Sequence, residues 1–333
     1  MALVPSGLLV PSKSLGMTAP LGPASRPPRV TIGLPVYNGE RYLAEALDSL
    51  LAQTFRDFEL IISDNASTDR TPEICQEYAA RDPRIRYERL EANIGGFRNH
   101  NRVVKFARGE YFTWAAHDDR REPEHLARCV ERLDADPEIV LCFTDQRRID
   151  EEGAALPPQA FLARTSSPDA FERWRDMVLG NCVYDPNYGV FRTEVLLQTR
   201  LLAQHADSDR TLLAEMALHG RFHRVAEPLF VRRIHPGGSW RQFDSVQEFT
   251  VWFAPERAGT TSFPNLSILR SFVAALNRAP VSWGTRLACY RPMVQWALDC
   301  RDLLRREAMS AISEIWARMA NRPGAGRPHP GLR

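Results

Sequence analysis

Two adjacent carboxylates, Asp118 and Asp119, follow the apolar run of residues 111–116. Such a run predicts a strand, so the pair would stand where a strand turns into a loop. Paired carboxylates at that place can hold a hard divalent cation such as Mg²⁺ or Mn²⁺, which in turn grips a diphosphate. The alternative is that both residues only cap a helix that begins near Glu122.

A third carboxylate, Asp64, follows the apolar run of residues 58–63 and precedes Asn65, Ala66 and Ser67. At the end of a strand it can accept hydrogen bonds from a ribose or a nucleobase. The alternative is a turn in which the aspartate side chain bonds the neighbouring backbone. Residue type and position leave both interpretations open.

Alternating strands and helices between residues 29 and 150 would position these groups. The predicted strands cover residues 30–34, 58–63, 85–88, 111–116 and 139–143, and the predicted helices cover 41–53, 97–108 and 122–134, with another from Thr71. This rhythm is typical of an α/β fold with a mostly parallel sheet and helices on both faces. Ligands of such sheets bind at the carboxyl ends of the strands, which are residues 35–38, 64–65, 93–96 and 117–119.

The second half of the chain is less regular. Helices are predicted over residues 171–179, 210–218, 266–277 and 285–320, and strands near 190 and over 228–234. Because the strand–helix rhythm stops after Trp240, we expect an α/β domain over residues 29–240 and a helical appendage over 241–320. Residues 1–28 and 321–333 are rich in small residues, proline or arginine, and we expect them to be disordered.

Composition argues against several classes of protein. The formal net charge of +2 is too small to predict a nucleic-acid partner. The six cysteines have no zinc-like or redox-pair spacing, which predicts free thiols in a reducing, cytoplasmic compartment. No apolar run approaches the ~20 residues that span a bilayer. The sequence has neither a glycine-rich dinucleotide fingerprint nor a Walker A motif, which argues against a dinucleotide-dependent oxidoreductase.

The order of the motifs carries a family resemblance. PVYNGE at residues 35–40 follows the first strand, DNASTD at 64–69 the second, NIG at 93–95 the third and DD at 118–119 the fourth. NYGVFR at 187–192, SDR at 208–210 and RIHP at 233–236 come later. This series resembles the family-2 glycosyltransferases, which have the GT-A fold, over about residues 29–240.

The resemblance implies a role for each matching residue. Tyr37 would stack on a nucleobase, Asp64 would bond it, and Asp118 would contact the ribose or the sugar. The whole nucleotide-sugar site would comprise Pro35, Tyr37, Asn38, Glu40, Asp64, Asn93, Arg98, Asp118 and Gly189. Asp119 and His235 would bind the divalent metal, and Asp209 would take the proton from the acceptor hydroxyl in an inverting displacement.

Two features of the sequence leave open whether the metal is required and which aspartate is the base. The family motif is Asp-any-Asp, but Ala116 or His117 stands in place of its first carboxylate, so a strict need for the metal is open. Asp207 competes with Asp209 for the role of base, and either could instead cap the following helix.

The resemblance implies an enzyme that moves a sugar from a nucleoside diphosphate sugar, UDP or dTDP favoured, to a hydroxyl of a glycan or glycolipid. Cell-envelope polysaccharide assembly would be its setting, and the motif around Asp209 is similar to those of hexosyl- and rhamnosyltransferases. The alternative is a non-catalytic nucleotide-sugar-binding or scaffold protein that keeps the fold.

The C-terminal segment that begins near Trp283 mixes apolar and basic residues. Its apolar residues are Trp283, Leu287, Tyr290, Met293, Trp296 and Leu298, and its arginines are Arg286, Arg291, Arg301, Arg305 and Arg306. A basic amphipathic helix can lie on an anionic membrane, which would place the protein at the inner face of that membrane. The alternative is a helix that packs on the α/β domain and turns its arginines outward.

Overall fold

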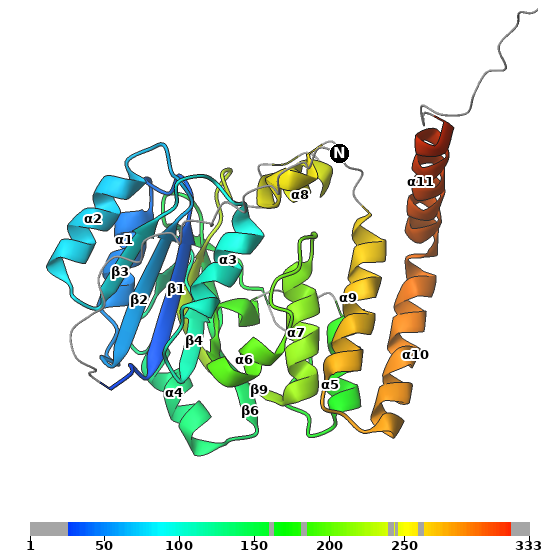
Figure 1. Ribbon diagram of the computed structural model, residues 1–333. Coiled ribbons are helices and arrows are strands. Elements are labelled where there is room, and N and C mark those ends of the chain that lie inside the picture. The colour runs from blue at the N-terminus through cyan, green and yellow to red at the C-terminus, as the bar shows by residue number, and fades with distance from the viewer. Residues whose placement is uncertain are drawn as a thin grey trace, which may run out of the picture.

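The computed structural model of the chain (Figure 1) describes residues 26–159, 163–180, 185–238, 243, 246–258 and 263–320. The expected disorder of residues 1–28 and 321–333 therefore concerns residues that lie mostly outside this part. Trp240, where we expect the α/β region to end, also lies outside it. The division into domains at that residue stays a proposal.

A single sheet of nine strands organises the part of the chain that the structure describes. Its order is β3-β2-β1-β4-β8-β6-β9-β5, and β7 pairs with β6 outside this path. The strands are β1 (Val30–Val36), β2 (Phe58–Asp64), β3 (Ile85–Arg89), β4 (Tyr111–Trp114), β5 (Arg120–Arg121), β6 (Ile139–Ile149), β7 (Ala155–Leu156), β8 (Val190–Arg192) and β9 (Arg221–Arg233). Pairing is parallel through β3-β2-β1-β4 and between β6 and β9, whereas β8 runs antiparallel to both its neighbours.

Two hydrophobic clusters attach helices to the two faces of the sheet. Successive strand residues point to opposite faces, so Leu60 packs in one cluster and Ile61 in the other. The first cluster holds α1 (Leu43–Leu51), α2 (Thr71–Arg81) and α4 (His125–Ala135). The second holds α3 (Gly96–Lys105), α5 (Ala170–Leu179), α6 (Thr193–Gln198) and α7 (Ser208–His219). The expected α/β class, with helices on both faces, is confirmed.

Glycines let α3 approach the sheet and start at the edge where the strands end. A Cβ on Gly33 would lie 2.7 Å from Val103 Cγ2 of α3, so the helix can pack directly on β1 only because this strand residue has no side chain. Gly95 has φ +85, the left-handed region, and precedes the first residue of α3. The turn that carries Asn93 is thereby placed beside the carboxyl ends of β1 and β2.

The C-terminal helices share the second hydrophobic cluster (Figure 1). α9 (Pro264–Arg278) packs on α7, and α10 (Trp283–Asp299) packs on α5 and α9. Trp174 of α5 also donates its ring N–H to the carbonyl oxygen of Cys289 in α10, at 3.0 Å. α11 (Arg301–Ala320) follows, so the single helix expected over residues 285–320 is two helices separated at Cys300.

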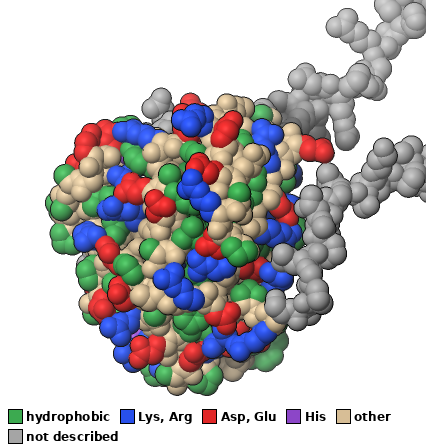
Figure 2. Space-filling model, turned by 90° about the vertical axis from the view of Figure 1, so that its left-hand side faces the viewer, with side chains coloured by type: hydrophobic (Ala, Val, Ile, Leu, Met, Phe, Trp, Pro, Cys, Tyr) green, Lys and Arg blue, Asp and Glu red, His purple; other side chains and the backbone are tan. Residues whose placement is uncertain are grey.

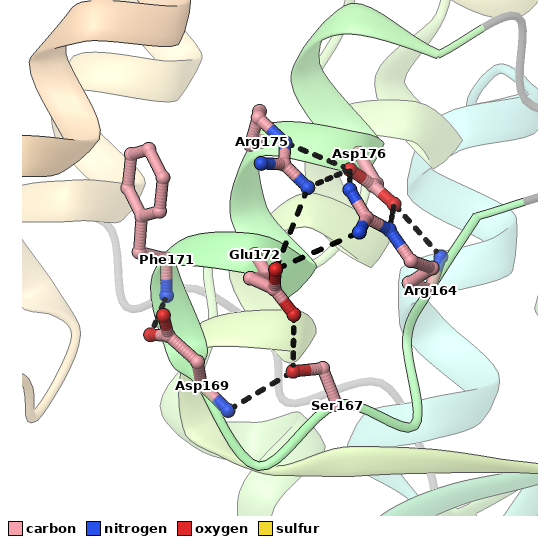
Figure 3. Close-up of polar contacts among 7 residues, drawn as sticks. All are labelled: Arg164, Ser167, Asp169, Phe171, Glu172, Arg175 and Asp176. Carbon is pink, nitrogen blue, oxygen red and sulfur yellow. Dashed lines mark hydrogen bonds and ion pairs between the residues drawn. The ribbon is translucent and has the colours of Figure 1, made fainter.

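Polar contacts fix the start of α5, the helix that packs against α7 (Figure 3). Asp169 caps α5, and its carboxylate accepts the N–H of Phe171 at 2.9 Å. Arg164 and Arg175 both donate to Asp176, each at 2.9 Å. These contacts tie the segment before α5 to the helix itself, and so support the framework on which α7 rests.

The surface of the described residues has a mixed charge. On the face that Figure 2 shows, acidic and basic side chains are interspersed, in agreement with the small net charge. Across the described residues, no helix combines the length and apolarity that a membrane span requires.

Candidate active site

A cleft of about 440 Å³ lies at the carboxyl ends of β1, β4 and β9, and α8 (Val246–Phe253) forms one of its walls. Eight of the twelve residues expected in the site line this cleft. They are Pro35, Tyr37, Asn38, Asn93, Asp118, Asp119, Asp209 and His235. The structure thus brings together in one cleft residues that are up to 200 positions apart in the sequence.

The loops after β1 and β2 are pinned to each other by hydrogen bonds. Asn38, with φ 52, accepts the N–H of Thr68 at 2.8 Å and donates its own N–H to Ser67 Oγ at 2.9 Å. Glu40 accepts the N–H of Arg70 at 2.9 Å. The side-chain oxygens of Asn38 and Glu40 therefore hold the loop in shape, and only Asn38 of the two also lines the cleft.

Asp64 is fully buried beneath these loops and does not line the cleft. Its Oδ1 accepts the N–H of Ser67 at 2.8 Å, and its Oδ2 accepts the hydroxyl of Tyr87 at 2.9 Å. Arg89 Nε lies 3.5 Å from the same Oδ2. These are the turn contacts that the alternative interpretation of Asp64 expected, and its role toward a base stays a prediction.

Two amides line the cleft beside Tyr37. Asn65, which the sequence analysis did not assign to the site, donates to Asn93 Oδ1 at 2.9 Å and accepts the N–H of Ile94 at 2.9 Å. Asn93 Oδ1 also accepts the N–H of Gly95 at 2.8 Å. The amides thus fix each other in place before any ligand arrives.

Arg98 and Gly189 lie outside the cleft lining. Arg98 is half exposed and forms an ion pair of 2.8 Å with Glu256. A Cβ on Gly189 would lie 2.6 Å from the carbonyl oxygen of Cys142, so this glycine allows the turn before β8 to pack on β6. Its neighbours Asn187 and Tyr188 line the cleft instead.

The two adjacent aspartates have different surroundings. Asp118 Oδ2 lies 2.9 Å from His235 Nε2, whereas Asp119 Oδ1 accepts the backbone N–H of Arg233 at 2.8 Å. Burial raises the pKa of Asp119 to about 8, and the charge of Asp118 acts in the same direction. Burial also acts to raise the pKa of Asp118, but His117 and His235 outweigh it and the pKa lies below its usual value. Asp118 is therefore the member of the pair that stays ionised near neutral pH.

The donor set fits a metal ion only in part. No group of three or more histidine, cysteine or acidic side chains suited to a metal occurs in the described part of the chain. Asp118 and His235 face each other, and Asp119, which follows Asp118 in the sequence, also lines the cleft. Mg²⁺ is usually bound by one or two carboxylates together with substrate phosphates, so a set of this size would need the oxygens of a diphosphate to complete the coordination.

Asp209 lies in the first turn of α7 and lines the cleft. Burial raises the pKa of Asp209 to about 7, and the charge of Asp207 adds to this. Asp207 also lines the cleft and precedes the helix with φ 59, but its side chain makes no capping hydrogen bond. A carboxylate with a pKa near 7 suits a general base, so Asp209 has the property that this role requires.

Sequence reasoning missed Arg232 and the aromatic residues of α8. Arg232, the last residue but one of β9, lies on the cleft wall, and its charge acts to lower the pKa of both Asp119 and Asp209. Phe249, Trp252 and Phe253 line the wall that α8 forms. The one sequence signal for this wall is the helical spacing of the three aromatic residues after Val246.

Comparison with known proteins identifies the family of the chain. Residues 31–198, half of the chain, match the family described as "Glycosyl transferase family 2". An uncharacterized protein of Mycobacterium tuberculosis is 36% identical over 212 residues, which cover 61% of this chain and 58% of the relative. The chondroitin synthase of Escherichia coli is 36% identical over 128 residues, which cover 38% of this chain and 18% of that one.

Solved structures agree on the fold. Residues 1–349 of Staphylococcus aureus TarS, crystallised with UDP-GlcNAc, match with a TM-score of 0.60 and 18% identity over 81% of this chain and 73% of that one. At this identity the likeness shows the fold alone, and it confirms the expected GT-A fold. The match of the family to half of the chain confirms the resemblance, and the chain belongs to glycosyl transferase family 2.

Proposed function

We propose that the protein is an inverting glycosyltransferase that uses a nucleoside diphosphate sugar. The acceptor hydroxyl oxygen attacks the anomeric carbon, the bond from that carbon to the diphosphate oxygen breaks, and the nucleoside diphosphate leaves. Asp209 takes the proton of the acceptor hydroxyl. The observation that carries this proposal is the cleft, where Asp209 faces the same space as Asp118, Asp119, His235 and the base-side residues.

The leaving diphosphate needs positive charge. In the proposed site Asp119 and His235 would hold a divalent metal, which would supply a Lewis acid for the developing charge on the diphosphate. Arg232 lies on the same cleft wall and adds a fixed guanidinium suited to phosphate oxygens. His235 and Asp118 keep each other oriented through their 2.9 Å contact.

The donor and the acceptor are part of the proposal, which the family and its structural relatives support. We favour UDP or dTDP as the carrier, and TarS provides an example of this fold crystallised with UDP-GlcNAc. The acceptor is a hydroxyl of a glycan or glycolipid, and a hexosyl or rhamnosyl group is the transferred sugar. The chain spans 58% of the length of its M. tuberculosis relative, so the activity of the whole protein is part of the proposal.

Thermal unfolding with a panel of nucleoside diphosphates tests the donor site. A ligand that binds only the folded state raises stability by about RT ln(1 + [L]/Kd). We expect a rise with UDP or dTDP that Tyr37→Ala reduces and that Asp119→Ala or omission of Mn²⁺ weakens. A rise without Mn²⁺ dependence would remove the metal from the proposal but keep the transferase.

The alternative of a non-catalytic binding or scaffold protein predicts a different outcome. Such a protein would bind a nucleotide sugar without ever hydrolysing it or transferring its sugar, although Asp119 and Asp209 are both in place. Absence of any nucleotide response in folded protein would overturn the donor site itself.

The proposed place of action is the cytoplasmic side of a membrane. Five cysteines of the described residues are free thiols, which agrees with a reducing compartment. Peripheral membrane contact through α10 and α11 is the second part of this proposal. It is supported by the apolar side chains that these two helices expose.

A further inference from the structure

The wall that α8 forms lies beyond the segment that matches the family. The match ends at residue 198, whereas α8 spans Val246–Phe253. In Figure 1 this helix lies at the top of the molecule, over the edge of the sheet where the strands end. Its residues Phe249, Trp252 and Phe253 line the cleft together with Tyr37 and Phe97.

The position of α8 is fixed by close packing on the start of α3. A Cβ on Gly96 would lie 2.3 Å from Phe253 Cδ1, and a Cβ on Gly95 would lie 2.4 Å from the carbonyl oxygen of Phe253. The Phe97 and Phe253 rings also pack with centroids 4.8 Å apart. Two consecutive glycines thus form the seat on which the C-terminal end of α8 rests.

Trp252 is the aromatic residue of α8 whose ring meets Tyr37. Phe249 is 5% exposed and packs between Phe97 and Phe243, so it belongs to the core of this wall. Trp252 is only partly buried, and it meets Tyr37 with centroids 6.3 Å apart and ring planes at 64°. The two rings form an open corner on the cleft, next to the amides of Asn65 and Asn93.

We propose that the corner of Tyr37 and Trp252 holds the nucleobase of the donor, with Trp252 as an affinity-determining contact. This inference rests on the proposed function, because it takes a nucleoside diphosphate as the ligand. A planar base fits an aromatic corner, stacking on one ring while its edge meets the other. Aromatic stacking tolerates any base, so Trp252 adds affinity while the neighbouring amides select the base.

Titration of UDP and of inorganic diphosphate tests the corner. We compare wild type, Trp252→Ala, Trp252→Phe and the matched control Trp283→Ala, which removes an exposed tryptophan of α10. Loss of one base–aromatic contact weakens binding by about tenfold or more. We expect that loss for UDP in Trp252→Ala, partial recovery in Trp252→Phe, no change in Trp283→Ala, and unchanged diphosphate affinity throughout. UDP should also quench tryptophan fluorescence less in Trp252→Phe than in wild type.

A second variant displaces the wall without altering its aromatic residues. Gly96→Ala places a methyl group where Phe253 packs, so UDP affinity should fall while thermal unfolding remains cooperative. Wild-type protein that binds no nucleotide would overturn the proposed function as a whole. Wild type that binds UDP while folded Trp252→Ala binds it equally well would overturn this inference alone. A raised KM for the acceptor with unchanged UDP affinity would assign Trp252 to the acceptor instead.

Discussion

Asp209 is the residue on which the proposed chemistry depends most directly. Asp209→Asn keeps the size of the side chain but removes its capacity to take a proton. Positioned general bases contribute roughly 10²–10⁴ in rate, so transfer should fall by about that factor. Calorimetry should show UDP affinity within twofold of wild type, because the base acts on the acceptor.

Asp207→Asn is the matched control for this variant, since both aspartates line the cleft two residues apart. We expect it to retain transfer with a moderate loss. If Asp207→Asn abolishes transfer and Asp209→Asn does not, the two roles are exchanged.

The pH dependence of transfer reports the ionisation of the same group. Burial, then the charge of Asp207, raises the pKa of Asp209 to about 7, while the N–H of Arg210 and the charge of Arg232 act to lower it. The base must be ionised, so kcat/KM should rise with pH up to about 7 and then level off. A profile that is already flat at pH 5 would contradict this pKa.

The free energy of unfolding should fall over the pH range in which kcat/KM rises. A pKa raised from 3.8 to about 7 means that the native state holds this proton more tightly than the unfolded chain does. The contribution of Asp209 to the free energy of unfolding is therefore lost as pH rises from about 4 to about 7. In urea unfolding, Asp209→Asn should become more stable relative to wild type as pH rises from 5 to 8. If the difference in free energy of unfolding between the two proteins is the same across this range, the pKa of Asp209 is not raised.

The residue types in the cleft were predictable, but their contacts were not. Carboxylates and amides at strand ends predicted Asp118, Asp119 and Asn93 in one place. Asp64 has the same type and position, yet its oxygens bond Ser67 and Tyr87. Sequence does not show which oxygen a turn will use, because that depends on the φ of residues such as Ala66, which has φ 62.

At the scale of elements, the pinned loops after β1 and β2 determine where Tyr37 stands. Asn38 has φ 52, which asparagine and glycine tolerate better than alanine. Asn38→Gly loses the bond to Thr68 but keeps the backbone conformation, whereas Asn38→Ala also strains it. We expect Asn38→Ala to be about 1 kcal/mol less stable than Asn38→Gly in urea, with weaker UDP binding. Equal stability of the two variants would mean that the loop does not require this conformation.

The regular elements of the first half were predictable because their apolar periods are uninterrupted. β6 continues past its predicted end to Ile149, and β9 begins before its predicted start, at Arg221. The additional residues of both strands include many charges, so they lack the apolar pattern from which strands were predicted. Parallel pairing of the two strands, with a bulge between Thr144 and Gln146, supplies the backbone bonds there. β5 was also missed, and it explains why Asp118 and Asp119 precede a strand and do not cap a helix.

The position of α8 could not be read from the sequence. Its aromatic spacing is ordinary for a core helix, and the seat that receives it is Gly95 and Gly96, about 150 residues earlier. A contact of such long range depends on the whole fold. The same reasoning applies to Arg232, which reaches the cleft only because β9 pairs with β6.

At the scale of the whole molecule, the outer face of α10 and α11 is unusually apolar. Trp283 is 76% exposed and Leu287 66% exposed, and further exposed members are Val294, Leu298, Leu303, Met309 and Ile312. Arg291 lies in the same stripe of α10, at helical spacing between Leu287 and Val294. The inner side of α10 packs on α5 and α9. The helix therefore both packs on the rest of the protein and exposes an apolar side that also carries an arginine.

The apolar and basic side chains on the outer face of α10 and α11 predict that the protein binds anionic vesicles. Among the side chains of α10 and α11 that the structure describes, the exposed arginines Arg291, Arg301, Arg305 and Arg306 outnumber the exposed acids Asp299 and Asp302. Basic residues near an anionic surface add about 1 kcal/mol each. In sedimentation the protein should bind vesicles that contain phosphatidylglycerol more strongly than neutral phosphatidylcholine vesicles, and salt should weaken the binding.

The double variant Trp283→Ser and Leu287→Ser should lose that binding without losing UDP affinity, because α10 lies apart from the cleft lining. Leu197→Ser is the matched control, since Leu197 is 50% exposed on α6. A wild type that ignores anionic vesicles but dimerises through the same residues would assign the face to a second copy of the chain.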